Sequence, residues 1–221
     1  MHLGSVAEKS IVDIERFQHA LALKTAGKEE DALLEFEALA AEAPDIQEKG
    51  SLILNQATCF WKLGRLKEAR ERLSEAQKLW SNLYADFLDA RLCVWEGRKD
   101  EALTKLTLFL ESHPDLDQSE NQHLYVDALE ELGRLFVDLE RTEDAVSPLE
   151  RALALAEDDQ HRRLLHYLGV CDVDRRNWEA AEKNFLQSLA TDPQDPLWPH
   201  AQYYLGICHL EIGNLQMLNR N

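Results

Sequence analysis

The sequence of 221 residues is poor in glycine, proline and cysteine, with 9 Gly, 6 Pro and 4 Cys. These low shares exclude collagen-like and low-complexity chains, and the wide spacing of the cysteines argues against a disulfide framework. No apolar run reaches the length of about 18 residues that a transmembrane helix needs. The N-terminal residues lack the charged and apolar regions of a secretory signal, so we expect a cytoplasmic protein.

Positive charge is also scarce. The chain has 24 Lys and Arg residues against 41 Asp and Glu residues, which gives a formal net charge of −17. A strongly negative protein repels nucleic-acid phosphates and anionic lipids. We therefore expect neither nucleic acid nor a membrane surface as a partner.

Motifs of catalysis are missing as well. The sequence contains no GxGxxG, GxxxxGK[ST], HExxH or GxSxG pattern. The two closest pairs of histidines in the sequence are His161 with His166 and His200 with His209. Neither pair has the spacing of metal ligands on one helix face. We therefore predict no enzymatic activity, no metal and no cofactor.

Small residues recur along the chain in two series. An alanine that follows a polar turn occurs at Ala32, Ala69, Ala102, Ala145 and Ala181. A second small residue precedes each alanine by a constant distance, and the series has a sixth member: Ala20, Ala57, Ala90, Gly133, Gly169 and Gly206. A constant offset with variable intervals indicates units of equal length, about 34 residues each, joined by unequal loops.

Each unit is predicted to be a helix, a turn and a second helix. Apolar residues follow helical spacing, as Leu129 and Leu132 do, and no segment alternates in the manner of a strand. Three turns contain a glycine, Gly27, Gly64 or Gly97, which supplies the left-handed conformation that ends a helix.

At these positions the chain resembles the tetratricopeptide repeat family. The fifth unit carries most of its pattern, with Leu165, Leu168 and Gly169 on the first helix and Ala181, Phe185 and Pro193 on the second, while Asp172 stands where an aromatic residue is usual. The resemblance covers about residues 13–212. It implies an all-α, right-handed superhelical solenoid of antiparallel helix pairs, with five repeats and one further helix.

The predicted domain is a single solenoid over residues 1–212. Its repeats span about 13–46, 50–83, 83–116, 126–159 and 162–195, followed by a partial repeat at 199–212. The polar stretch 115–123 is expected to form a loop, a lead-in to the next helix or a hinge. Residues 213–221 are expected to form a tail or a truncated repeat, which leaves open a trimmed chain, a longer natural chain or a homodimer through the C-terminal helix.

The four cysteines share one position in the pattern. Cys59, Cys93, Cys171 and Cys208 each follow the small residue of a first helix by two or three positions. A compact apolar side chain packs there, so we predict buried, reduced thiols and no redox function.

The first helices of such repeats line a concave groove, in which the family usually holds peptides. The predicted groove residues are Trp61, Tyr84, Phe87, Arg91, Trp95, Arg134, Arg163, His166 and Tyr203. Trp, Tyr and Arg are enriched at binding hot spots, and arginines along a groove favour an acidic or C-terminal segment. In the alternative interpretation, the aromatic rings pack between neighbouring helices.

The chaperone-tail clamp of the family needs Lys and Asn at set groove positions. The corresponding residues of this chain do not match: Phe17, Leu21, Leu54, Thr58, Phe87, Arg91, Glu130 and Arg134. We predict a scaffold, adaptor or co-chaperone that binds a protein or peptide in the groove. The alternatives are a ligand-responsive module that acts on a separate effector, and a self-assembly module that uses the incomplete C-terminal repeat.

Overall fold

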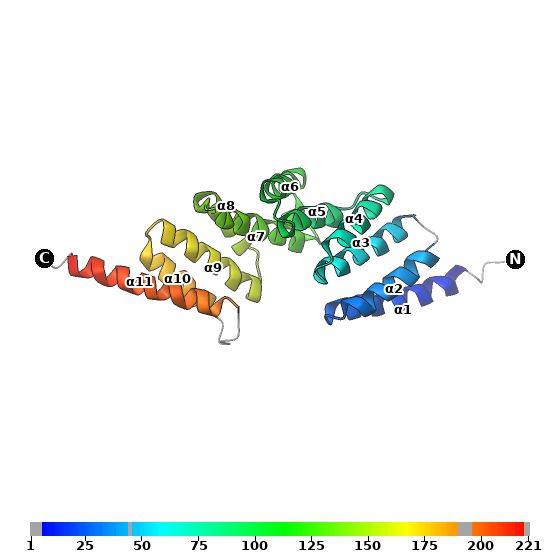
Figure 1. Cartoon of the computed structure of the whole chain (residues 1–221), viewed down its shortest axis with the longest axis horizontal. Helices are drawn as coiled ribbons and strands as arrows, with labels where there is room; N and C mark the ends of the chain where they lie inside the picture. Colours follow the sequence, from blue (N-terminus) through cyan, green and yellow to red (C-terminus); the bar gives the residue numbers. More distant parts are fainter. Residues whose placement is uncertain (1–5, 44–45, 190–195, 219–221) are drawn as a thin grey trace. The chain divides into compact units, whose positions relative to one another are not determined.

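The fold consists of α-helices connected by short turns (Figure 1). The computed structural model describes residues 6–43, 46–189 and 196–218. Within these ranges it contains one short 3-10 helix and no β-strand, which confirms the predicted all-α class. No helix among the described residues is long and apolar enough to span a membrane.

The chain divides into two compact units, residues 1–105 and 106–221. This division lies within a helix and precedes the polar stretch 115–123, where the sequence indicated a loop, a lead-in or a hinge. The first unit contains α1 (Val6–Thr25), α2 (Glu29–Glu42), α3 (Ile46–Lys62), α4 (Leu66–Leu79), α5 (Leu83–Trp95) and the beginning of α6 (Lys99–Ser112). From α1 to α5, each helix packs against the next one along the chain.

The core of the first unit alternates small and large side chains. Ala20, Ala32 and Ala57 are fully buried, and so is Phe36 beside them in the same apolar cluster. Because alanine brings two helix backbones close together, a large ring on the neighbouring helix fills the remaining space. The two series of small residues in the sequence therefore mark the helix contacts.

The second unit contains the end of α6, the 3-10 helix η1 (Leu116–Gln118), α7 (Gln122–Asp138), α8 (Thr142–Leu153), α9 (Asp158–Asp174), α10 (Trp178–Ser188) and α11 (Trp198–Leu218). From α7 to α11, each helix packs against the next one. The polar stretch forms η1 and a turn, in which Leu116 is buried, and α7 begins earlier than the predicted repeat boundary at residue 126.

Two glycines mark the closest helix contacts of the second unit. A Cβ atom added to Gly133 on α7 would lie 2.5 Å from Leu149 of α8. A Cβ atom added to Gly169 on α9 would lie 2.9 Å from Phe185 of α10. Each glycine thus accommodates the large apolar side chain that covers it.

The C-terminal helix is longer than the sequence indicated. The pattern predicts an end at Ile212 and a turn at Gly213, whereas α11 continues through Gly213 to Leu218. Glycine costs about 1 kcal/mol inside a helix, which the good helix formers Leu215 and Met217 that follow help to offset. The predicted helix stop at Pro193 and the tail residues 219–221 lie outside the described residues.

The cysteines are buried and free, as the pattern predicted. Burial raises the pKa of Cys59 to about 11 and that of Cys171 to about 12. Because the thiolate is the reactive form, these two side chains are inert at neutral pH.

Candidate protein-interaction surface

Four predicted groove residues of the first unit meet in one cluster, which we call the aromatic–arginine surface: Trp61 on α3, and Phe87, Arg91 and Trp95 on α5. The Arg91 guanidinium lies 4.2 Å from the centre of the Trp61 ring and 5.5 Å from that of Phe87. Trp61 and Trp95 meet edge to face, with ring centres 6.0 Å apart. Cation–π and edge-to-face contacts of this kind each contribute about 0.5–1.5 kcal/mol, so the rings are held in fixed positions.

The members of this surface differ in exposure. Trp95 is 60% exposed, so its ring is accessible to a partner. Phe87 is only 1% exposed and supports the surface from the core. Tyr84 is 36% exposed at the first turn of α5, where the Asn82 side chain accepts a hydrogen bond of 2.6 Å from the Tyr84 backbone N–H. That N-terminal cap fixes the start of the helix that carries most of these residues.

The indole of Trp61 is a polar group of the aromatic–arginine surface that is shielded from solvent. Its Nε1–H donates no hydrogen bond to any residue that the structure describes. A buried donor without an acceptor costs about 1–3 kcal/mol.

A charged network fixes α5 on its neighbours. Asp89 forms ion pairs with Arg70 of α4 and with Lys105 of α6, the latter at 2.5 Å. Glu96 pairs with Arg70 at 2.8 Å, and although burial alone would raise the pKa of Glu96, hydrogen bonds from Arg70 and Arg98 lower it. These contacts make the helix under Arg91 a rigid support.

In the second unit the predicted groove arginines have carboxylate partners. Both oxygens of Glu130 on α7 accept hydrogen bonds from Arg163 on α9, at 2.7 and 3.1 Å, and these bonds raise the pKa of Arg163. Gln160 donates to Glu130 at 2.8 Å. Arg134 pairs with Glu131 on its own helix. An acidic ligand would therefore have to compete with these carboxylates for Arg134 and Arg163.

His166 and Tyr203 occupy different environments. His166 is 1% exposed, 5.5 Å from the ring centre of Phe185, and one of its ring nitrogens lies 2.8 Å from His200 of α11. This burial gives His166 a packing role between helices. Tyr203 is 66% exposed on α11.

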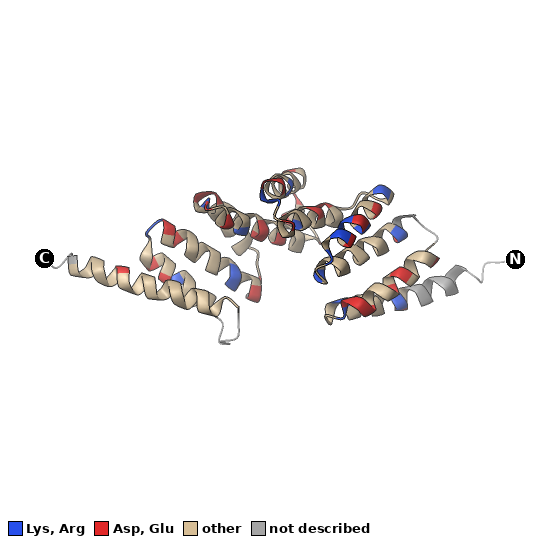
Figure 2. Ribbon diagram, in the orientation of Figure 1, with Lys and Arg blue, Asp and Glu red and all other residues tan. Residues whose placement is uncertain are grey.

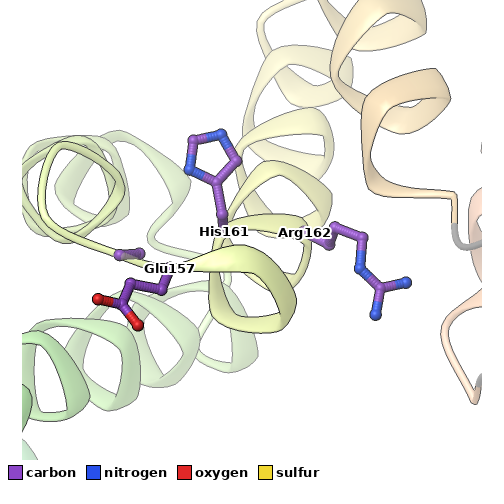
Figure 3. Close-up of a pocket in the computed structure, with 4 residues that line it drawn as sticks. Glu157, His161 and Arg162 are labelled. Atoms are coloured by element: carbon purple, nitrogen blue, oxygen red, sulfur yellow. The ribbon is translucent and has the colours of Figure 1, made fainter.

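A hollow that the sequence did not indicate lies at the junction of α8 and α9. It has a volume of about 750 Å³ and is lined by Ala156, Glu157, His161 and Arg162. The labelled side chains point in different directions (Figure 3), so they do not converge on one ligand atom. In the described part of the chain, no group of three His, Cys, Asp or Glu side chains is arranged to hold a metal ion.

Sequence profiles of known families match the C-terminal part of the chain. Two tetratricopeptide repeat profiles match residues 128–163 and 169–216. No curated protein matches the sequence.

Solved structures share the fold at low sequence identity. A tetratricopeptide repeat protein from Parabacteroides merdae is 18% identical with a TM-score of 0.62, covering 91% of this chain and 73% of that one. BtubC (BKLC) from P. vanneervenii is 19% identical with a TM-score of 0.65, covering 86% and 84%. A chain of the APC/C hetero-tetramer Cut9–Hcn1 is 16% identical with a TM-score of 0.70, covering 86% and 34%. With its paired helices and its repeated small residues, the chain has the tetratricopeptide repeat fold, and its C-terminal part matches tetratricopeptide repeats in sequence.

Proposed function

We propose that this chain is a protein-interaction scaffold that binds a segment of a partner protein at the aromatic–arginine surface. The general role is supported by the tetratricopeptide repeats, which generally serve as protein–protein interaction scaffolds. The main support for this binding site is the position of Trp95. Its large ring is 60% exposed and packs edge to face against Trp61. A rigid exposed aromatic side chain is the kind of anchor that dominates binding energies at protein interfaces.

The chemistry of the surface favours an apolar or aromatic anchor on the partner. A ring or branched aliphatic side chain would pack on Trp95, and a carbonyl or carboxyl oxygen next to it would accept from the Trp61 indole. The net charge of −17 and the carboxylate partners of Arg134 and Arg163 disfavour a strongly acidic segment. We therefore propose a segment with one large apolar anchor and neutral or basic flanks.

A peptide array tests this proposal. Peptides with a central aromatic or leucine anchor would be printed with acidic, neutral or basic flanks, and the dissociation constants of the hits measured by calorimetry. We expect hits among the neutral and basic peptides. Trp95→Ala and Arg91→Ala should each weaken their binding about 30-fold, which corresponds to about 2 kcal/mol.

Leu34→Ala is the matched control. Leu34 lies on α2 of the same unit and is 65% exposed, which is close to the exposed fraction of Trp95. This substitution should leave the affinity unchanged. Circular dichroism would show that all variants keep their helix content. Hits that bind Trp95→Ala and Arg91→Ala as tightly as the original chain would place the binding site elsewhere.

A further inference from the structure

One side of α11 is a stripe of alternating large and small residues, exposed at Tyr203, Gly206 and Leu210 and partly buried at Gly213. Tyr203 is 66% and Leu210 63% exposed, with Gly206 and Gly213 between and after them. These four residues, which we call the α11 stripe, follow one another at intervals of three and four and therefore share one side of the helix. The opposite side packs on α9 and α10 and includes Ala201, Leu205 and Cys208.

The preceding helix pairs show what covers the same position. Gly206 corresponds in the repeat to Gly133 and Gly169, which are covered by Leu149 of α8 and Phe185 of α10. A Cβ atom added to Gly206 would meet nothing within 4 Å. The stripe thus has the form of a surface that receives an antiparallel helix with a large apolar side chain over the glycine, and no described residue fills it.

A second α11 satisfies this requirement. If two copies of the helix lie antiparallel and cross through their stripes midway between Gly206 and Leu210, Leu210 faces Gly206 of the partner subunit and Tyr203 faces Gly213 of the partner subunit. Two-fold symmetry repeats both contacts in the reverse sense, so four large-on-small contacts form along the seam. Leucine over glycine is also the contact by which Leu149 covers Gly133.

The charge of α11 permits this pairing. A chain with a net charge of −17 repels its own copies. Along α11, however, Glu211 is the one residue among Lys, Arg, Asp and Glu, as the nearly uncoloured helix in Figure 2 shows. Two copies of the chain that meet at α11 therefore approach each other through the least charged α-helix of the described chain.

We propose that the chain forms a two-fold symmetric dimer in which the α11 stripes of two copies pack antiparallel. The dimer is independent of the aromatic–arginine surface, which lies in the other unit. One helix per copy buries less area than a standard interface, so we expect a dissociation constant in the range of roughly 1–100 μM.

Sedimentation equilibrium over a concentration series tests the dimer. The original chain should change from monomer to dimer with rising concentration, whereas Leu210→Glu should stay monomeric, with binding weakened at least 30-fold. Leu186→Glu is the matched control, because Leu186 is 54% exposed on α10 and outside the stripe. It should dimerise as the original chain does, and circular dichroism would confirm that both variants remain folded.

Two results would overturn the dimer. The original chain could remain monomeric up to about 300 μM, beyond the range expected for an interface of this size, and the stripe would then serve another occupant. Alternatively, Leu210→Glu could dimerise as well as the control, and the interface would then lie on a different surface.

Cysteine cross-linking tests the antiparallel register. Tyr203→Cys mixed with a differently sized Gly213→Cys chain should form a mixed disulfide under copper–phenanthroline oxidation, because the register brings these two positions together. Tyr203→Cys alone is the control and should cross-link much more slowly. The native cysteines are buried and should not compete. Faster cross-linking of Tyr203→Cys to itself would show a parallel pair and overturn the proposed arrangement.

Discussion

Five residues in the described part of the chain hold the left-handed backbone conformation that closes a helix at a turn. Three are Gly27, Gly64 and Gly97, with φ between 73 and 74°. The equivalent turns of the second unit use Glu140 and Arg176 instead, each with φ of 57°. A side chain with a Cβ atom costs about 1–2 kcal/mol in this conformation, so both turns are strained.

Glu140→Gly should therefore stabilise the chain. The gain is about 0.5–1 kcal/mol, because the strain that glycine removes exceeds the extra entropy that it gains in the unfolded chain. Glu140 is exposed, so little packing is lost. The free energy of unfolding would be measured by urea titration.

Two controls accompany that variant. Glu140→Ala keeps the Cβ atom and should bring no gain. Gly27→Ala should lose about 1 kcal/mol through strain alone, because its Cβ atom would meet nothing within 4 Å. An equal effect of glycine and alanine at position 140 would contradict the role of backbone strain.

For single residues, the sequence predicts the backbone conformations that a residue type favours, but it does not predict conformations and burial that depend on tertiary packing. Gly27, Gly64 and Gly97 indicate their turns because glycine readily adopts positive φ. Glu140 and Arg176 give no such signal, and only the repeat alignment identifies their turns. In the same way, Phe87 and His166 share the groove positions of exposed residues, yet packing buries both.

Helices in each pair are brought together by a small residue under a large one. Gly133 lies under Leu149, and the equivalent Gly206 lies under nothing within the described residues. Gly133→Ala should therefore overpack the contact, whereas Gly206→Ala should not. Both variants gain the same helix propensity, so the difference between their unfolding free energies isolates the packing cost.

We expect Gly133→Ala to be less stable than Gly206→Ala by about 1–3 kcal/mol. Urea titration would measure the unfolding free energies of both variants, at a protein concentration well below the dissociation constant of the proposed dimer. Equal stabilities would mean that Leu149 moves aside at no cost and that the small residue does not control helix approach.

Contacts between neighbouring first helices are also readable from the repeat. Glu130 and Arg163 are 33 positions apart, and His166 and His200 are 34 apart, which is close to one repeat. Residues at such a separation lie side by side on stacked first helices, so the repeat length explains why Arg163 lies beside Glu130. The pairing itself and the rotamer that joins Gln160 to Glu130 were not predicted, because they depend on side-chain packing in three dimensions.

For the whole molecule, the excess of negative charge opposes compactness. The formal net charge is −17, while individual surface ion pairs contribute only about 0.2–1 kcal/mol each. Salt weakens both effects, since the screening length falls from about 30 Å at 0.01 M to about 10 Å at 0.1 M. Long-range repulsion among the excess carboxylates is lost first, because their separations exceed those of paired groups.

The folded chain should therefore become more stable as salt is added. We expect the thermal unfolding midpoint to rise by a few degrees between about 0.01 and 0.15 M ionic strength, the range over which screening of repulsion dominates. The Leu210→Glu variant should be used, because it separates this effect from dimer formation. NaCl and Na₂SO₄ at equal ionic strength should give equal rises, which distinguishes screening from the stronger exclusion of sulfate from protein surfaces. A midpoint that falls with salt would mean that ion pairs such as Arg70 with Asp89 outweigh the net repulsion.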